Sequence, residues 1–368
     1  MKVRFVIQGF DGGGGPQSTL DISDAIKIHG IESDIYSFKE FSNGLSNTKV
    51  FKALYCLWCY LYGTSKYEKE CIFINSGGIL IGAFLALYIY ILRFFFRRKI
   101  IYLNIFHNRI KSDNDSFLIN YLRYILSFFS LSAAQKAICV SEGLRCEIHE
   151  DFRLFGCVKN KLITIYNPKR DFPPRSISNT EDKKNVKRIL SVGRLCKQKS
   201  FETLLNAYKL LILDHDIPDT NLVIVGEGDE LFDLKKMTTQ LSIEDNVSFL
   251  GFTKHIEKEY YNSDVFVLPS IHEGFGLVLV EALSCGLPVI STNCRYGPSE
   301  ILGDGKYGEL VPIQDHEAMY KAIKNILILN EHDLSLKINE GLIRANEFNK
   351  PTIGAKYSTV LNELVEHN

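Results

Sequence analysis

Two glutamates, Glu273 and Glu281, flank a segment that is predicted to form a strand end, a tight turn and the start of a helix. Gly274 and Gly276 lie in the turn, where the missing side chains let the backbone bend closely around a ligand. The helix is expected over residues 277–285, because a glycine and then a proline follow it. One carboxylate therefore lies in the loop and the other about one turn into the helix.

The start of this helix is predicted to bind phosphate. The amide groups of Gly274, Phe275, Gly276 and Leu277 and the positive end of the helix dipole point to one spot. A carboxylate repels phosphate but accepts hydrogen bonds from hydroxyl groups, so the two glutamates would contact sugars on either side of it. The pattern indicates a nucleotide sugar as ligand, although an ordinary turn with two solvated glutamates has the same glycine spacing.

Two cations, Arg194 and Lys199, follow another predicted strand that ends at Gly193. They are expected in the same layer of strand ends as Glu273. Two fixed cations opposite a helix N-terminus can bind a diphosphate and stabilise the charge that it gains as a leaving group. Either cation alone would be an ordinary surface residue in a charged loop.

The first strand is followed by a loop of four glycines, Gly12 to Gly15, which allows a ligand close to the backbone amides. It lacks the Lys-Ser/Thr of a P-loop and fits the dinucleotide-binding spacing poorly, so a flexible turn is the alternative. His107 follows a later strand and is expected in the same cleft, where it could bind a sugar hydroxyl or relay a proton.

Metal chemistry is not expected. The two Asp-x-Asp matches, at Asp113 to Asp115 and Asp214 to Asp216, do not directly follow a strand and are more typical of solvated turns. The chain has no paired carboxylates suited to double displacement and no Gly-x-Ser-x-Gly nucleophile motif. We therefore predict neither a metal nor another cofactor.

Strand-like and helix-like runs alternate along the chain, which predicts an α/β protein with parallel sheets and helices on both faces. A polar, proline-rich stretch at 169–185 is the expected linker between two doubly wound, Rossmann-like domains that face each other across a cleft. The predicted strands are 3–7, 71–74, 100–105, 137–140, 188–192, 222–225, 247–250, 265–268 and 288–291.

The formal net charge is zero, which argues against a nucleic-acid partner. Residues 1–168 are basic, with 20 Lys and Arg against 14 Asp and Glu. Basic side chains next to aromatic ones at the end of an apolar helix suggest contact with an anionic membrane surface, or else a half-buried helix with a solvated end. The uncharged stretch 71–92 is long enough for a membrane span, but Asn75-Ser-Gly-Gly78 interrupts it. The basic residues are Arg93, Arg97, Arg98 and Lys99.

The nine cysteines lie mostly in apolar runs and are expected to be reduced. Cys56 and Cys59 have the spacing of a redox or zinc pair, but no second pair follows at a zinc-site distance. The N-terminus is expected to form the first strand and is too short in its apolar part for a signal peptide. We predict a cytoplasmic protein, peripheral on the inner face of the cytoplasmic membrane.

Taken together, these motifs resemble the retaining glycosyltransferases of the GT-B fold, family 4, also called group 1. Ser200 departs from the family, which usually has glycine after the lysine, and Asn108 stands where an acidic residue often follows the histidine. The matching residues are the Gly12 to Gly15 loop, His107, Val192-Gly-Arg-Leu195 with Lys199, Val225-Gly-Glu-Gly-Asp229, Leu250-Gly-Phe252 and Glu273-Gly-Phe-Gly-Leu277 with Glu281.

The resemblance implies a role for each matching residue. Arg194 and Lys199 would bind the donor diphosphate, Glu281 the nucleotide ribose and Glu273 the donor sugar, while His107 would lie beside the reacting sugar. The last helix in this family returns to the first domain, so the domains would be 1–168 with 349–368 and 186–348. The remaining donor-binding residues would be Gly13, Gly14, Gly15, Gly226, Glu227, Gly274, Phe275, Gly276 and Leu277.

The resemblance further implies a retaining transfer without a metal. The segment from Arg295 to Leu302 is similar to bacterial enzymes that build surface polysaccharides or lipid-linked oligosaccharides. We expect a hexose or N-acetylhexosamine to move from a UDP-sugar to a lipid-linked oligosaccharide or to a lipopolysaccharide, O-antigen or capsule precursor. The alternatives are a nucleotide-sugar transferase with a soluble acceptor, such as a sucrose or glycogen synthase type, and a non-catalytic nucleotide-binding module.

Overall fold

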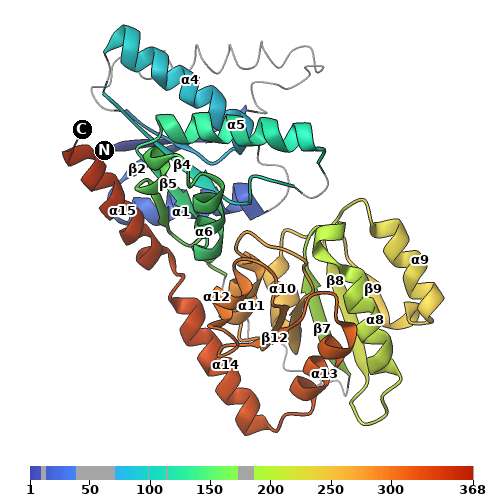
Figure 1. Cartoon of the computed structure of the whole chain (residues 1–368). Coiled ribbons are helices and arrows are strands. Elements are labelled where there is room, and N and C mark those ends of the chain that lie inside the picture. Colours follow the sequence, from blue (N-terminus) through green and yellow to red (C-terminus); the bar gives the residue numbers. More distant parts are fainter. Residues whose placement is uncertain (10–13, 39–70, 98, 113–114, 173–185, 368) are drawn as a thin grey trace. The chain divides into compact units, whose positions relative to one another are not determined.

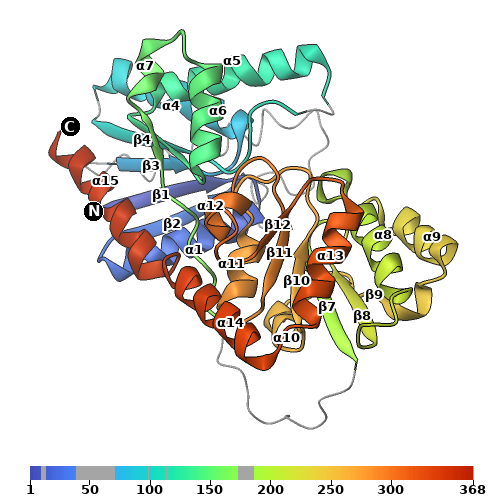
Figure 2. The same cartoon turned by 60° about the horizontal axis from the view of Figure 1, so that its bottom comes forward.

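The computed structural model describes residues 1–9, 14–38, 71–97, 99–112, 115–172 and 186–367. The chain divides into two compact units: residues 1–168 with 349–368 form unit 1, and residues 169–348 form unit 2. Within the described residues each unit has one six-stranded sheet, all of whose neighbouring strands are parallel, with helices packed on its faces (Figures 1 and 2). The predicted α/β class with two doubly wound domains is confirmed.

The sheet of unit 1 has the strand order β2-β1-β3-β4-β5-β6. Every residue of the central strands β3 and β4 is buried, as expected for a parallel sheet that is covered on both faces. The strands are β1 (Lys2–Ile7), β2 (Glu32–Ser37), β3 (Cys71–Asn75), β4 (Ile100–Phe106), β5 (Lys136–Cys139) and β6 (Leu162–Thr164). The helices are α1 (Gly14–Ile28), α4 (Ile79–Phe96), α5 (Phe117–Ala133), α6 (Glu142–Asp151), α7 (Gly156–Lys159) and α15 (Lys350–Glu366).

The last helix, α15, packs against α1 in unit 1. Gly354 permits the close approach, because a Cβ atom there would lie 2.2 Å from the Ala25 carbonyl oxygen. Two polar contacts fix the pair: His29 Nε2 lies 2.9 Å from the Pro351 carbonyl oxygen, and Lys350 Nζ lies 3.2 Å from Asp21 Oδ1. The C-terminal residues are thus part of the same unit as the N-terminal strand.

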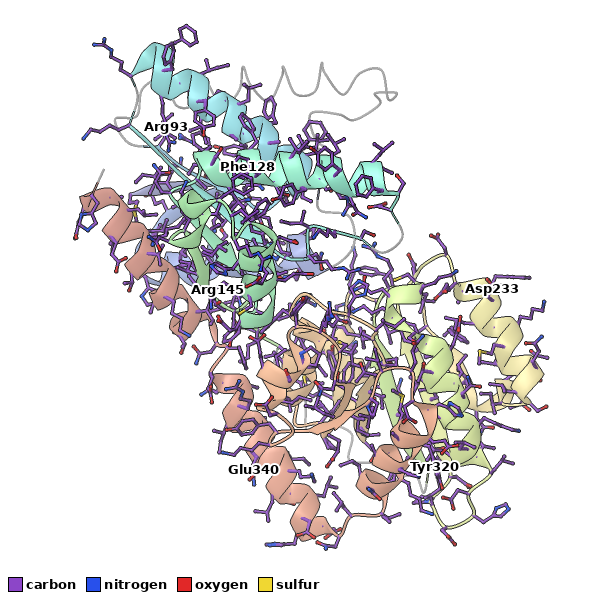
Figure 3. All side chains as sticks on the ribbon, in the orientation of Figure 1. Arg93, Phe128, Arg145, Asp233, Tyr320 and Glu340 are labelled. Atoms are coloured by element: carbon purple, nitrogen blue, oxygen red, sulfur yellow. The ribbon has the colours of Figure 1, made fainter. Side chains whose placement is uncertain are left out.

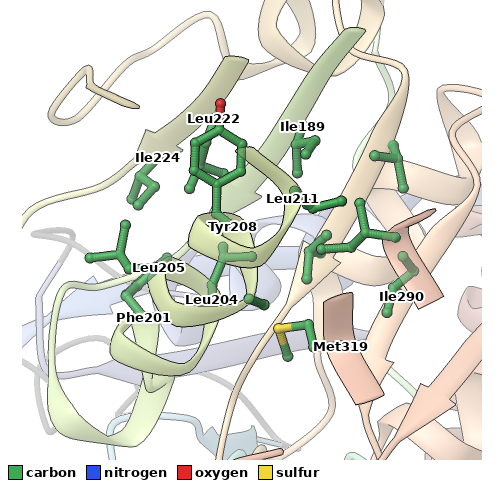
Figure 4. Packing of buried hydrophobic residues seen from close by; sticks show 14 of the residues in the cluster. Ile189, Phe201, Leu204, Leu205, Tyr208, Leu211, Leu222, Ile224, Ile290 and Met319 are labelled. Atoms are coloured by element: carbon green, nitrogen blue, oxygen red, sulfur yellow. The ribbon is translucent and has the colours of Figure 1, made fainter. Parts of the chain in front are cut away.

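The sheet of unit 2 has the order β12-β11-β10-β7-β8-β9. Figure 4 shows its core, where Ile189 and Leu222 from the strands pack against Tyr208 of α8 and Met319 of α13. The strands are β7 (Lys187–Val192), β8 (Thr220–Val225), β9 (Val247–Phe249), β10 (Val265–Leu268), β11 (Val289–Thr292) and β12 (Glu309–Val311). The helices are α8 (Phe201–Ile212), α9 (Leu231–Leu241), α10 (Ile256–Tyr261), α11 (Leu277–Ser284), α12 (Pro298–Leu302), α13 (His316–Leu327) and α14 (Glu331–Asn346), with short 3-10 turns η3 (Lys197–Lys199) and η4 (Glu244–Asn246).

All nine predicted strands are present, but three further strands, β2, β6 and β12, were not predicted. All three lie at sheet edges. Strand β2 is mostly polar in sequence, and β6 and β12 have three residues each. An edge strand with one half-covered face lacks the continuous apolar run that marks a central parallel strand.

The uncharged stretch 71–92 does not form one long helix. It contains strand β3 and the first part of α4, separated by Gly78 with a φ of 89°. In the part of the chain that the structure describes, no helix combines the length and the apolar character that crossing a bilayer requires.

Candidate active site

The segment between β10 and α11 has the predicted strand, turn and helix. Gly276 precedes α11 in the left-handed conformation, with a φ of 93°, and no side chain caps the helix. The loop rests on the turn before α12, where a Cβ atom at Gly297 would lie 1.8 Å from the Phe275 carbonyl oxygen. Glu273 N also donates to the Arg295 carbonyl oxygen over 3.3 Å. Backbone contacts therefore fix the path of the glycine turn.

The buried Glu273 and the half-buried Lys199 form an ion pair. The distance between Lys199 Nζ and Glu273 Oε1 is 2.5 Å, and the two side chains are 16% and 8% exposed. Ser270 Oγ donates to the same carboxylate oxygen over 2.6 Å. An unpaired charge at this depth would be costly, so the donors fix the position of the carboxylate.

The short turn η3 delivers Lys199 to this position. Gln198 joins η3 to the β10–α11 loop, because Ile271 N donates to its carbonyl oxygen and its Nε2 donates to the carbonyl oxygen of His272, each over 2.8 Å. The stem of Lys199 lies against Gly193, where a Cβ atom would be 3.3 Å from Lys199 Cε. Lys199 and Glu273 thus come together through loops that follow neighbouring strands, β7 and β10.

Ser200 follows Lys199 in the left-handed conformation, with a φ of 48°. This backbone geometry explains why glycine suits the position, since a side chain there costs about 1 kcal/mol. Its Oγ lies 2.9 Å from Thr203 Oγ1 in the first turn of α8. The serine therefore retains the turn that positions Lys199.

The Val225-Gly-Glu-Gly motif packs against the loop after β7. A Cβ atom at Gly226 would lie 1.9 Å from the Gly193 carbonyl oxygen, and one at Gly228 would lie 2.2 Å from the Leu195 carbonyl oxygen. Leu195 N donates to the Glu227 carbonyl oxygen over 2.9 Å. Both glycines are required by this close packing, whatever ligand the loop binds.

Glu281 lies on α11 with partners different from those of Glu273. Tyr260 Oη donates to Glu281 Oε2 over 2.9 Å, and Arg170 Nε lies 3.7 Å from Glu281 Oε1. Burial, together with the nearby Glu281 carboxylate, raises the pKa of Tyr260 well above its usual value, so the phenol stays a donor. The Glu281 side chain is almost fully buried and its orientation is fixed by these contacts.

The other predicted donor-site residues of unit 2 are less constrained. The side chain of Arg194 is exposed and has no hydrogen bond or ion pair with any described residue, although its carbonyl oxygen accepts from Cys196 N over 2.9 Å. Glu227 Oε1 accepts a long hydrogen bond, 3.4 Å, from Phe252 N in the loop after β9. The structure therefore brings Lys199 and Glu273 together, while Arg194 is left at the surface.

In unit 1, His107 follows β4 and is half-buried. Its Nε2 lies 2.7 Å from Ser76 Oγ, which in turn lies 2.6 Å from Thr19 Oγ1. Burial lowers the pKa of His107 from 6.5 to about 4, so the ring is neutral near pH 7. Of the glycine loop, Gly14 and Gly15 are the first residues of α1, and Gly13 lies outside the described residues.

Ser76 and Thr19 were not predicted as site residues from the sequence. Ser76 belongs to the Asn75-Ser-Gly-Gly78 interruption, whose polar residue directly after a strand was a usable signal. Asn75 just before it is also bonded, with its Nδ2 donating to Asn104 Oδ1 over 2.5 Å. A layer of polar side chains thus lies at the carboxyl ends of β3 and β4.

The Asp-x-Asp segments form ion pairs. Lys324 and Tyr320 both donate to Asp214 and hold the pKa of its carboxyl at about 2. Asp115 pairs with Arg123 over 3.1 Å, and Asp113 lies outside the described residues. Among the described residues, no group of three or more His, Cys, Asp or Glu side chains could bind a metal. Six of the nine cysteines are free thiols, and Cys56 and Cys59 lie in the part that is not described.

Arg93 does not extend toward a surface. Its guanidinium donates to the Ala133 carbonyl oxygen over 2.9 Å and to the Ile100 carbonyl oxygen over 2.7 Å, and Figure 3 shows it between α4 and the sheet. It is half-buried and joins α4 to α5 and β4. Arg97 and Lys99 are exposed, and Arg98 lies outside the described residues.

A family model described as glycosyl transferases group 1 matches residues 174–340, the region that contains the Lys199–Glu273 pair. Residues 174–340 thus form a group 1 glycosyltransferase domain. The resemblance inferred from the sequence motifs is thereby confirmed. The family model covers most of unit 2.

Similar proteins extend the likeness to the whole chain. A glycosyltransferase of Haemophilus influenzae is 28% identical over 328 residues, which cover 89% of this chain and 82% of that protein. The N-acetylgalactosamine-N,N'-diacetylbacillosaminyl-diphospho-undecaprenol 4-alpha-N-acetylgalactosaminyltransferase of Campylobacter jejuni is 35% identical over 165 residues, 45% of this chain and 44% of that protein. Anabaena HepE, solved with UDP and glucose, has a TM-score of 0.76 at 19% identity over 99% of this chain and 100% of that one. This structural match shows the GT-B fold.

The lowered pKa of His107 predicts acid sensitivity. The unfolded chain protonates this ring below pH 6.5, but the folded glycosyltransferase does so only near pH 4. The free energy of unfolding that His107 contributes is therefore fully present above pH 6.5 and is lost as the pH falls toward 4. We expect His107→Gln to remove this part of the pH dependence, at most about 3 kcal/mol.

Urea unfolding of the wild type and of His107→Gln at several pH values between 6.5 and 4 measures the difference. His332→Gln, on an exposed helix turn, is the matched control. Identical pH dependence in the wild type and His107→Gln would contradict the shift.

Proposed function

We propose that this glycosyltransferase is a retaining enzyme that moves a hexose or N-acetylhexosamine from a UDP-sugar to a lipid-linked oligosaccharide or to a lipopolysaccharide, O-antigen or capsule precursor. The observation that carries the proposal is the partly buried Lys199–Glu273 pair beside the glycine turn before α11. A cation for the diphosphate and a carboxylate for the sugar hydroxyls lie next to each other there. Glu281, further along the same helix, supplies an acceptor for the ribose hydroxyls.

UDP is the proposed nucleotide because the HepE structure contains UDP and glucose. Lys199 would bind the diphosphate with a charge-assisted hydrogen bond, and Arg194, which is exposed and unpaired among the described residues, would supply a second cation. Stabilising the negative charge that develops on the leaving diphosphate is then the main catalytic contribution of the protein.

Retention is proposed because the carboxylate nearest the turn is poorly suited to attack. Glu273 Oε1 already accepts hydrogen bonds from Lys199 and Ser270, which stabilise the charge that a nucleophile would have to share. We propose that the bond from the anomeric carbon to the diphosphate breaks first. The acceptor hydroxyl then attacks from the same face and transfers its proton to the departing diphosphate oxygen.

A lipid-linked acceptor is proposed from the relatives and from the surface of unit 1. The name of the Campylobacter relative specifies a diphospho-undecaprenol acceptor. In unit 1, Phe94 and Phe95 are 79% and 71% exposed, and they adjoin the exposed Arg97 and Lys99. Cations beside exposed aromatic rings suit an anionic membrane surface. The neighbouring helix α5 exposes further apolar residues, namely Phe117, Leu118, Tyr121, Leu122 and Ile125.

For the donor site, we expect Lys199→Ala to weaken UDP binding roughly tenfold to a hundredfold, the usual contribution of a charge-assisted hydrogen bond. Glu281→Ala should also weaken it, because the ribose loses its acceptor. Titration calorimetry with UDP measures both, and Lys197→Ala, an exposed lysine on the same turn η3, is the control. Unchanged UDP affinity in both variants would show that the proposed position of the donor is wrong.

For the reaction, we expect the purified enzyme to release UDP from a UDP-sugar in the presence of a diphospho-undecaprenol-linked sugar acceptor. The proposal needs no metal, so the rate should be unchanged in excess chelator. A panel of UDP-hexoses and UDP-N-acetylhexosamines identifies the donor. Release only with soluble sugar acceptors would favour the soluble-acceptor alternative, and loss in chelator that manganese restores would contradict metal independence.

For the membrane surface, we expect the protein to sediment with vesicles that contain anionic lipid and not with neutral ones. Each basic residue near such a surface contributes about 1 kcal/mol, so Arg97→Ala combined with Lys99→Ala should weaken binding by roughly tenfold or more. Lys235→Ala with Lys236→Ala, two adjacent exposed cations on α9, is the matched control. Equal sedimentation of both double variants would rule out the proposed contact.

A further inference from the structure

Three side chains of unit 1 form a continuous hydrogen-bonded chain that ends at a backbone carbonyl. His107 Nε2 contacts Ser76 Oγ over 2.7 Å, and Ser76 Oγ contacts Thr19 Oγ1 over 2.6 Å. Thr19 Oγ1 in turn donates to the Gly15 carbonyl oxygen over 3.1 Å. Thr19 is fully buried and Ser76 is 8% exposed, so water has little access to these hydroxyl groups.

The last contact sets the direction of the chain. A carbonyl oxygen only accepts hydrogen bonds, so the hydroxyl group of Thr19 donates its single proton to the Gly15 carbonyl oxygen. Ser76 must then donate its proton to Thr19 Oγ1, and Ser76 Oγ is left to accept a proton from His107 Nε2–H. The opposite direction would place Thr19 Oγ1 and the Gly15 oxygen 3.1 Å apart with no proton between them. Only one direction satisfies all three contacts.

We propose that Thr19 and Ser76 are positioning residues that hold His107 in the tautomer with its proton on Nε2, leaving Nδ1 as an acceptor for a hydroxyl group of the sugar substrate. The assignment of the substrate hydroxyl rests on the proposed function. The lowered pKa of His107 agrees with a neutral ring. A neutral ring has one donor nitrogen and one acceptor nitrogen, so fixing the first defines the second.

The hydrogen-bonded chain also connects His107 to the end of the glycine loop. Gly15 lies in the first turn of α1, directly after the residues of the loop that the sequence places near the donor. A shift of this turn would move the acceptor of Thr19 and disturb the direction of the chain. The histidine therefore depends on a residue 92 positions earlier in the sequence, through two hydroxyl groups.

The tautomer can be measured directly in the ligand-free protein. In protein with ¹⁵N-labelled histidine, a long-range proton–nitrogen spectrum distinguishes protonated from bare ring nitrogens, and His107→Gln identifies the signals of His107 among the nine histidines. We expect the protonated-type shift at Nε2 and the bare-type shift at Nδ1. A protonated Nδ1 would overturn the proposal.

Variants test the two positioning residues. Thr19→Val and Ser76→Ala should each give a mixed tautomer signal and lower kcat about tenfold or more, with little change in KM. Thr19→Ser keeps the hydroxyl group, so its tautomer signal and its kcat should match those of the wild type. Ser18→Ala is the matched control, since Ser18 is buried in the same helix turn and donates to the Gly14 carbonyl oxygen over 2.7 Å, as Thr19 does to Gly15. An unchanged spectrum in the folded Thr19→Val and Ser76→Ala variants would overturn the proposal.

The spectrum and the activity assay separate the two conclusions. A wrong tautomer overturns this inference whether or not the protein releases UDP. The expected tautomer without any UDP release overturns the proposed function and leaves the hydrogen-bonded chain in place.

Discussion

A buried carboxylate needs donors, and this requirement at Glu273 organises the strand ends of unit 2. Lys199 and Ser270 donate to the same oxygen. Gln198 attaches η3 to the loop after β10 through two hydrogen bonds, one from its backbone carbonyl and one from its side chain. This attachment places Lys199 within reach of the Glu273 carboxylate. If the carboxylate lost these donors, it would be a buried charge without compensation. The path of the loop after β7 is thus determined by a residue that follows β10.

Close backbone packing provides the rest of this arrangement. Gly226 leaves no space for a side chain beside the Gly193 carbonyl, and Gly297 leaves none beside the Phe275 carbonyl. These glycines pack four loops in two pairs, the loop after β8 on that after β7 and the loop after β11 on that after β10, and the Lys199–Glu273 ion pair joins the two pairs. A glycine motif that suggests a ligand in the sequence can therefore serve packing first, and the ligand site is the consequence of this packing.

The sequence predicted the centre of each sheet better than its edges. Central strands such as β4 are buried on both faces and appear as continuous apolar runs, whereas β12 has three residues and one neighbour. The proximity of Lys199 and Glu273 could be predicted, because the carboxyl ends of parallel strands share one edge. The inward turn of Arg93 could not, since its acceptors, Ala133 and Ile100, are brought together only by the packing of α4 on its neighbours. Ser76 could be noticed because it directly follows a strand, but Thr19 carries no such signal, and the contact between the two depends on how α1 packs on the sheet. The roles of the site residues toward a ligand stay predictions.

The two cations of the candidate site differ in what they require of a ligand. The ammonium of Lys199 has three donors, and the structure commits one of them to Glu273, so a phosphate can use the others without breaking the ion pair. Arg194 is exposed and keeps its hydration until a ligand arrives. Binding through Lys199 therefore uses a group that is already ordered and partly dehydrated, and its entropic cost is small. Binding through Arg194 would have to order a long, exposed side chain, which costs conformational entropy. A more highly charged form of the ligand offsets this cost better, because it attracts the guanidinium more strongly. In the proposed reaction the departing diphosphate carries more charge than the intact donor, so Arg194 would contribute more to the transition state, whereas Lys199 would contribute to both states.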